Sequence, residues 1–275
     1  LRRVKREQFT APKRRGRRIA KNVRPQYINY VLQGSNKKSL QDIRVAADIG
    51  NGMASVLVPL LADKLPIQFT TLFADLDGRF PNRGSDPTLK KHQKTLIKEL
   101  QTNSYDFGIS FDGDADRIAF LDERGRYVNC AVIGALIAEH LLKKEPKAGI
   151  VYTNLTSRVF YEAIKAAGGT PVRARVGHAF LKRKLRETGA VFGAEHSGHF
   201  FWRDFYCTDS VILTLRAVLE IYGAAKQAGQ TFSELVAPYQ RYQQLEDVVI
   251  AVEDKEVSLA KVRAFVTKRW PEATL

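Results

Sequence analysis

The sequence lacks the features that mark several specialised classes of protein. It holds only two cysteines among its 275 residues, Cys130 and Cys207, and they lie far apart. Two such cysteines build neither a disulfide framework nor a zinc site, so we expect both to pack as small apolar side chains in a reducing compartment. No apolar run approaches the ~20 residues of a membrane span, and no apolar signal-peptide core follows the basic N-terminus. The sequence therefore predicts a cytoplasmic protein without a membrane partner.

Acidic residues are also in short supply. The chain carries 44 Lys and Arg against 29 Asp and Glu, a formal charge of +15. Because such an excess is typical of nucleic-acid-binding proteins, its location matters. Residues 1–24 alone carry +10, since they hold eleven basic side chains and one acid, Glu7, and the other 251 residues carry only +5. We interpret 1–24 as a basic, solvated connecting arm, with nucleic-acid binding as the less favoured alternative.

From Tyr27 onward, apolar strands alternate with amphipathic helices, which is typical of a parallel sheet covered by helices. The expected strands are 43–47, 67–73, 107–111, 118–121, 127–128, 150–152, 171–176 and 191–194. The expected helices are 53–65, 87–100, 131–142, 158–167, 180–187 and 210–225. We expect Asp86 to cap the second of these helices, Asp209 or Thr208 to cap the last, and Thr231 to open a capping box.

These elements form two consecutive α/β units with mixed sheets, at 25–127 and 128–240. The tail 241–275 adds a strand at 248–252 and a helix at 258–268, which are too few to make a domain alone. The predicted fold class is therefore α/β, with a partial third unit at the C-terminus.

The strongest chemical signal is the segment Asp112-Gly-Asp-Ala-Asp-Arg117, which directly follows a strand. The carboxylates of Asp112, Asp114 and Asp116 would repel one another and be driven toward protonation unless a cation held them together. A site made of oxygen ligands favours magnesium, calcium or manganese over zinc. Arg117 is expected either to offset this charge or to grip a phosphate.

Two other interpretations of this segment are weaker. A calcium loop of the helix-loop-helix kind needs a preceding helix, and it needs Gly where Arg117 stands. An acidic surface turn without an ion seldom lies at the carboxyl end of a parallel strand, where α/β proteins bind their ligands.

A second signal is Gly193-Ala-Glu-His-Ser-Gly-His199, which also follows a strand. Polar side chains between glycines suit a loop that hydrogen-bonds the hydroxyls of a polyol. A metallopeptidase motif would need its two histidines four residues apart on a helix, and His196 and His199 are not so placed. Ser197 does not form a nucleophile elbow, because Glu195 stands where that motif needs Gly.

A third signal is Gly177-His178 at a strand-to-helix turn, where backbone N–H groups could face a phosphate or a hydroxyl. The alternative is a helix start with an incidental histidine.

Taken together, five segments resemble the α-D-phosphohexomutase superfamily, in its phosphomannomutase/phosphoglucomutase branch. In chain order they are Asp48-Ile-Gly-Asn-Gly-Met-Ala-Ser55, Phe80-Pro-Asn-Arg-Gly-Ser-Asp-Pro-Thr-Leu89, Asp112–Arg117, Val176-Gly-His-Ala179 and Glu195–His199. The resemblance implies four domains around a central cleft. Residues 25–127 and 128–240 would be the second and third, and 241–275 the start of the fourth.

The resemblance also implies roles for particular residues. Asp112, Asp114 and Asp116 would bind a catalytic Mg²⁺, and Arg117 would lie against the reacting phosphoryl group. Gly177, Glu195 and Ser197 would bind the sugar, and His178 and His199 would transfer protons or recognise hydroxyls. The implied reaction is an isomerisation that exchanges a phosphoryl group between the 1- and 6-positions of mannose or glucose phosphate, through a bisphosphate.

The chain also departs from the family pattern. No serine lies in a Ser-His-Asn-Pro loop, no Arg-x-Ser-Gly-Thr segment is present, and Asn154 stands near the position of a family lysine. We therefore expect an internal fragment that does not turn over unaided. The alternative function is a non-catalytic α/β binding protein with a basic arm, derived from a mutase.

Overall fold

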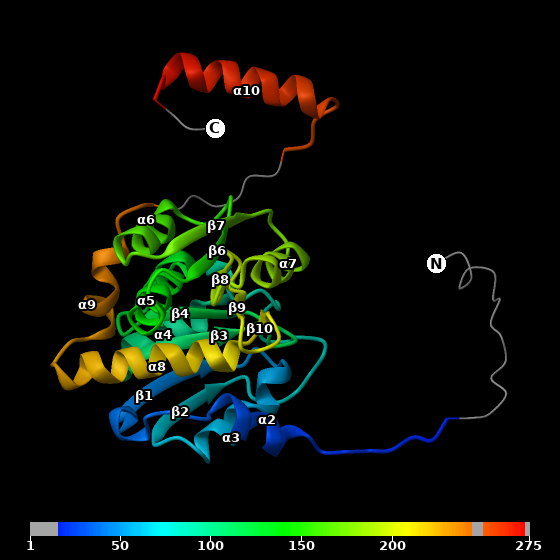
Figure 1. Ribbon diagram of the computed structural model, residues 1–275. Helices are drawn as coiled ribbons and strands as arrows, with labels where there is room; N and C mark the ends of the chain where they lie inside the picture. Colours follow the sequence, from blue (N-terminus) through cyan, green and yellow to red (C-terminus); the bar gives the residue numbers. More distant parts are fainter. Residues whose placement is uncertain (1–15, 244–249, 273–275) are drawn as a thin grey trace. The chain divides into compact units, whose positions relative to one another are not determined.

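The computed structural model describes residues 16–243 and 250–272 (Figure 1). The chain divides into two compact units, Leu1–Tyr242 and Gln243–Leu275. The sequence predicts a basic arm at 1–24. Residues 1–15 of this arm lie outside the described residues, and residues 16–23 have no helix or strand.

The first sheet has three parallel strands followed by two antiparallel ones. Its strands are β1 (Ile43–Asp48), β2 (Ile67–Leu72), β3 (Phe107–Phe111), β4 (Ile118–Asp122) and β5 (Tyr127–Val128). Their order is β2-β1-β3-β4-β5, and pairing becomes antiparallel between β3 and β4. Every residue of β3 and β4 is buried, as expected for central strands covered on both faces.

The second sheet repeats this plan. Its strands are β6 (Gly149–Thr153), β7 (Thr170–Ala174), β8 (Phe192–Ala194), β9 (Phe200–Trp202) and β10 (Thr208–Asp209). Their order is β10-β9-β8-β6-β7, and pairing becomes antiparallel between β8 and β9. The connection from β3 to β4 and the connection from β8 to β9 therefore occupy the same place in the two sheets.

Helices surround and join the two sheets. They are α2 (Arg24–Val31), α3 (Val58–Ala62), α4 (Lys94–Thr102), α5 (Cys130–Lys144), α6 (Arg158–Ala166), α7 (His178–Thr188), α8 (Val211–Gln227) and α9 (Phe232–Val236), with short 3₁₀ helices η1 (Lys37–Leu40), η2 (Met53–Val56), η3 (Lys90–His92) and η4 (Ala237–Tyr239). Most of α5 and α8 is buried. Helix α5 contacts β4 of the first sheet and β8 of the second, while α8 contacts η1 and β9. One continuous apolar core therefore spans both sheets.

The α/β fold with two mixed sheets is confirmed, but several local predictions are wrong. The helix expected at 53–65 is split into η2 and α3, and Pro59 lies in the first turn of α3. The helix expected at 87–100 begins only at Lys94, because Asp86 caps a turn instead. Its Oδ1 accepts hydrogen bonds from the N–H and the hydroxyl of Thr88, at 2.9 and 2.7 Å.

The helix at 210–225 has a different cap from the one predicted. Ser210 caps α8 by accepting a hydrogen bond from the N–H of Leu213 at 3.3 Å, so neither Thr208 nor Asp209 has that role. Both residues instead form β10, a strand that the sequence did not predict. The capping box at Thr231 is confirmed.

In its described part, the second compact unit has one helix, α10 (Lys255–Arg269), which includes the helix predicted at 258–268. Asp254 caps it by accepting from the N–H of Val257 at 3.0 Å. The strand predicted at 248–252 lies partly outside the described residues, and its described part, 250–252, has no strand.

Polar contacts tie α8 to the first sheet. Asp106 accepts hydrogen bonds from the Tyr222 hydroxyl at 2.6 Å and from the Lys226 ammonium at 2.8 Å. Gly223 of α8 lies against the backbone of Ser39. This close approach holds the two sheets in one arrangement.

We predict that Gly223→Ala destabilises the protein, because the added Cβ would overlap the Ser39 carbonyl oxygen. The loss should be about 1–3 kcal/mol, as for other overpacked sites, measured by urea unfolding. Gly78→Ala is the matched control, since its Cβ would meet nothing within 4 Å. Equal stability of the two variants would contradict this account.

Candidate active site

Two loops from the two sheets meet at the centre of the site. They connect β3 to β4 (112–117) and β8 to β9 (195–199). The N–H of Ile118 donates to the carbonyl of Gly198 at 3.1 Å. Gly198 has φ +94°, and a Cβ there would lie 3.0 Å from the Ile118 carbonyl, so glycine permits this approach. The structure thus brings together the two strongest signals of the sequence.

The loop 112–117 is a tight turn that hydrogen bonds hold in place. The buried carboxylate of Asp112 accepts through Oδ1 from the N–H groups of Asp116 and Arg117, at 3.0 and 3.1 Å. The carbonyl of Gly113 accepts from the N–H of Met53 at 3.0 Å. A Cβ at Gly52 would lie 2.7 Å from that carbonyl, which explains the glycine there.

Asp112, Asp114 and Asp116 offer a donor set that fits a divalent cation. One carboxylate oxygen from each lies within 4.8 Å of the others. The pKa of Asp116 is raised to about 6, through burial and the charges of Asp112 and Asp114, against the opposing effect of His199. This crowding of negative charge is what a hard, oxygen-preferring ion such as Mg²⁺ relieves.

Arg117 is held between two carboxylates. Its Nε donates to Asp112 Oδ2 at 2.8 Å, and one terminal nitrogen lies 3.4 Å from Asp86. Burial alone would lower the pKa of Arg117, but its hydrogen bond to Asp112 and the charges of the nearby carboxylates together outweigh this and raise it. The pKa of Asp112 is lowered, since its bonds to Arg117 outweigh its own burial. Both side chains are therefore charged at neutral pH.

Arg83 and Asp48 form a buried ion pair beside the candidate site, and the sequence assigned no role to either. The Arg83 Nε donates to both oxygens of Asp48 at 2.9 Å, and another nitrogen donates to the Phe111 carbonyl at 2.7 Å. Burial raises the pKa of Asp48 despite the charge of Arg83. The pair joins the ends of β1 and β3 beneath the loop 112–117, and Arg83 lies within the segment 80–89 that carries the family resemblance.

The loop 195–199 presents free hydrogen-bonding groups. Glu195 is buried, and its Oε1 accepts from the N–H of Gly177 at 2.9 Å. Among the described residues, neither Glu195 Oε2 nor the hydroxyl of Ser197 has a partner. Gly177 has φ +120°, which favours glycine. These groups are placed to bind hydroxyls of a ligand.

His178 and His199 differ in their surroundings. His178 is exposed at the start of α7 and makes no hydrogen bond or ion pair with another described residue, so its catalytic role stays a prediction. His199 is largely buried, and its Nδ1 lies 3.3 Å from Asp209 and 3.7 Å from Asp116. Burial lowers the pKa of His199, but Asp209 and Asp116 outweigh that effect and raise it.

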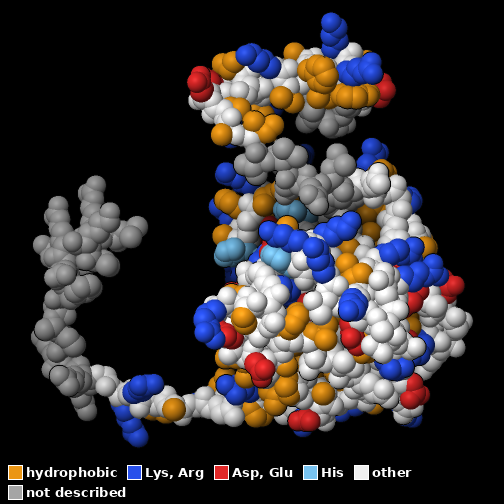
Figure 2. Space-filling model, turned by 180° about the vertical axis from the view of Figure 1, so that it is seen from behind, with side chains coloured by type: hydrophobic (Ala, Val, Ile, Leu, Met, Phe, Trp, Pro, Cys, Tyr) orange, Lys and Arg blue, Asp and Glu red, His pale blue; other side chains and the backbone are white. Residues whose placement is uncertain are grey.

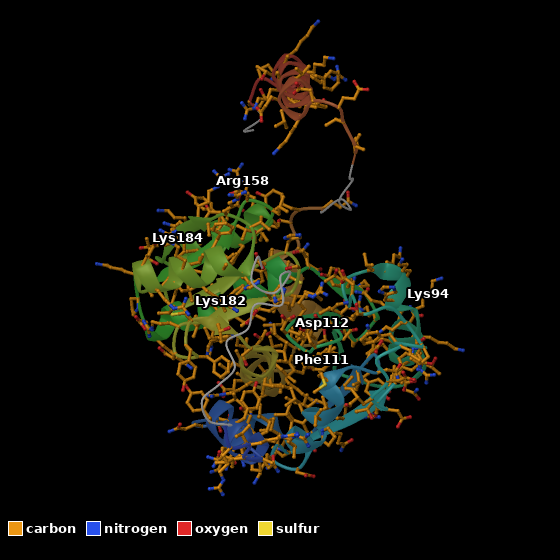
Figure 3. The ribbon with its side chains drawn as sticks, turned by 90° about the vertical axis from the view of Figure 1, so that its right-hand side faces the viewer. Lys94, Phe111, Asp112, Arg158, Lys182 and Lys184 are labelled. Carbon is orange, nitrogen blue, oxygen red and sulfur yellow. The ribbon has the colours of Figure 1, made fainter. Side chains whose placement is uncertain are left out.

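Positive side chains lie around this site. Arg173 donates to Asn154 at 2.6 Å, and Arg175 lies over the ring of Phe180 at 5.1 Å. Neither arginine has a carboxylate partner within the described ranges. On the face shown in Figure 2, Lys and Arg side chains surround the His side chains. In Figure 3, Asp112 lies in the half of the first unit that contains the first sheet, and Lys182 lies in the half that contains the second sheet. Such a setting favours an anionic ligand.

Comparison with known proteins identifies the family of this chain. The model of phosphoglucomutase/phosphomannomutase domain II matches residues 25–125, and the model of domain III matches residues 131–242. The chain belongs to the phosphoglucomutase/phosphomannomutase family. The resemblance inferred from the five segments is thereby confirmed.

Individual members of the phosphoglucomutase/phosphomannomutase family agree with this assignment. The chain is 32% identical to phosphohexose mutases of Xanthomonas campestris over 247 residues, which cover 90% of this chain and 54% of that protein. It is 32% identical to Escherichia coli phosphomannomutase, over 76% of this chain and 47% of that one. A crystal structure of a family protein from Burkholderia thailandensis matches with a TM-score of 0.72 and 30% identity, covering 79% of this chain and 46% of that one. The chain thus spans about half the length of the curated relatives.

Within the described residues, no helix is long and apolar enough to cross a membrane. Cys130 and Cys207 are both free, and Cys130 is buried as predicted. The cytoplasmic location stays a prediction.

We predict that Asp114→Asn weakens Mn²⁺ binding about tenfold or more, because it removes one anionic ligand. Asp114 is exposed, so the fold should be unaffected. Calorimetric titration with Mn²⁺, which prefers similar oxygen ligands, measures the change. Asp204→Asn is the control, because that side chain is 84% exposed and lies outside the loop. Unchanged affinity in Asp114→Asn would contradict the assignment.

The affinity for Mn²⁺ should depend on pH. Because the pKa of Asp116 is raised to about 6, the ion must displace a proton below that pH and binds unopposed above it. Affinity should therefore fall about tenfold per pH unit below 6 and level off above 7. Titrations between pH 5 and 8 test this, and a flat profile would contradict it.

Proposed function

We propose that this chain provides the metal-binding and sugar-binding half of a Mg²⁺-dependent phosphohexomutase. The reaction moves a phosphoryl group between the 1- and 6-positions of mannose or glucose phosphate, through a hexose bisphosphate. The observation that carries the proposal is the contact between the loops 112–117 and 195–199 through Ile118 and Gly198. This contact supports the proposal because it joins the loop that carries three carboxylates to the loop that carries Glu195 and Ser197.

The residues have separate roles in this proposal. Asp112, Asp114 and Asp116 hold Mg²⁺, which when bound neutralises charge on the transferring phosphoryl group. Arg117 lies beside them, fixed by Asp112 and Asp86, and offers its remaining N–H groups to the same phosphoryl oxygens. Phosphoryl transfer requires positioning and charge neutralisation above all, and a preorganised arginine supplies both.

The loop 195–199 orients the sugar. The free Oε2 of Glu195 accepts hydrogen bonds from hydroxyls, the Ser197 hydroxyl donates or accepts, and Gly177 fixes Glu195. In this proposal His199 accepts a proton from the attacking hydroxyl. His178, which directly follows Gly177 in the chain, transfers protons or recognises hydroxyls. Mannose and glucose differ in the orientation of one hydroxyl, and this loop suits both.

The names of the relatives, phosphohexose mutases and phosphomannomutase, support the substrate class. One solved structure is an N-acetylphosphoglucosamine mutase variant in complex with glucose 1,6-bisphosphate. That protein is 17% identical to this chain, so the likeness itself shows the fold alone. We assign 25–127 and 128–240 as the second and third family domains and 241–275 as the start of the fourth. The phosphoserine loop and the C-terminal phosphate-binding loop of the family would come from other parts of the intact protein.

We predict that Asp114→Ala lowers kcat of the intact protein by about a hundredfold or more, because the reaction loses its metal. The assay follows conversion of mannose 1-phosphate and glucose 1-phosphate in the presence of Mg²⁺. Asp204→Ala, at an exposed carboxylate outside the site, should keep full activity. Absence of mutase activity on both sugars, or full activity of Asp114→Ala, would refute the proposed function.

A further inference from the structure

A carboxylate outside the two loops, that of Asp209, faces His199. Asp209 Oδ2 lies 3.3 Å from His199 Nδ1, and both side chains are largely buried. We propose that Asp209 is a positioning residue that fixes the ring orientation and the tautomer of His199. The assignment builds on the proposed function, in which His199 accepts the hydroxyl proton.

The two oxygens of Asp209 have different partners. Oδ1 accepts from the Thr208 hydroxyl at 2.8 Å and lies 3.1 Å from the Lys182 ammonium on α7. Oδ2 faces the histidine. The carboxylate is thus pinned through one oxygen and presents the other to the ring. Its pKa is lowered because the bonds to His199, Thr208 and Lys182 outweigh its burial, so it stays ionised at neutral pH.

The β9–β10 hairpin brings the carboxylate of Asp209 close to His199. Asp209 pairs with Phe201 across the hairpin, two residues after His199. The turn between the strands uses positive φ angles at Tyr206 and Cys207, 56° and 53°, which are unusual for such side chains. Ser210 takes the capping of α8, which leaves Asp209 available for the histidine.

The surroundings of the ring select one tautomer. Nδ1 lies 3.3 Å from Asp209 and 3.7 Å from Asp116, at ion-pair distance, and it makes no aligned hydrogen bond within the described chain. A neutral ring therefore carries its proton on Nδ1, where it is attracted by both. Nε2 is then the unprotonated atom and can accept a proton from a hydroxyl, while Asp209 stabilises the resulting cation.

A metal ion bound by Asp116, His199 and Asp209 is the competing interpretation, since their ligand atoms lie within 4.8 Å of one another. The Lys182 ammonium argues against it, because it already neutralises Asp209 and repels a cation there. The charges around Asp209 therefore favour a carboxylate–histidine pair over a second metal site.

The test is NMR of this chain labelled with ¹⁵N in histidine, recorded without metal at about pH 9, where imidazole rings are neutral. The His199 signals are those missing from His199→Gln. We expect the wild type to show a protonated Nδ1 and an unprotonated Nε2. In Asp209→Asn the population should shift to the Nε2–H tautomer that free histidine prefers.

Asp204→Asn is the control, since it makes the same substitution at an exposed site in the same hairpin, and it should leave the spectrum unchanged. An Nε2–H tautomer in the wild type, or an unaltered tautomer in a folded Asp209→Asn, would overturn the inference. If Asp209→Asn fails to fold, Thr208→Val and Lys182→Met are the substitutes, because each removes one partner of Asp209 Oδ1. Both variants should shift the tautomer population in the same direction by a smaller amount. No shift in either variant would overturn the inference. The spectrum involves no turnover, so this inference can fail while mutase activity stands, and the reverse.

Discussion

The hydrogen bond from Ile118 to Gly198 is the contact on which the site depends. Each sheet changes from parallel to antiparallel pairing after its third parallel strand, and a loop with polar side chains lies at each change. Neither loop alone has the groups that the proposed reaction needs. The approach at Gly198, where a side chain would crowd the Ile118 carbonyl, brings the carboxylates within reach of His199. The common core around α5 and α8 keeps them there.

Charge is the second constraint, and it links the fold to the proposed chemistry. Asp112 is neutralised by Arg117, and Asp209 by Lys182. Burial and the charges of Asp112 and Asp114 raise the pKa of Asp116, against the opposing effect of His199. The protein therefore satisfies the carboxylates that hold structure and leaves unsatisfied the group that a metal ion would relieve. Arg83 has a supporting part in this arrangement, because it neutralises the buried Asp48 beneath the loop.

Much of the fold, and the loops that carry the candidate site, could be predicted from the sequence, because the signals were local. Apolar runs marked the strands, and the three carboxylates of 112–117 lie too close in sequence to end up apart. The predicted roles of Asp86 and Asp209 were wrong because tertiary contacts decide them. Asp86 looked like a helix cap, but it holds a turn and pairs with Arg117, which lies 31 positions further along the chain. Asp209 also looked like a cap, and no local pattern showed that a short hairpin would turn it toward His199.

The most direct test of the central claim, that the two loops form one site, is a crystal structure of this chain with Mn²⁺ and a hexose 1-phosphate. The account predicts one anomalous peak among the carboxylates of Asp112, Asp114 and Asp116, with sugar hydroxyls hydrogen-bonded to Glu195 and Ser197. A peak elsewhere, or a sugar bound away from the loop 195–199, would contradict it.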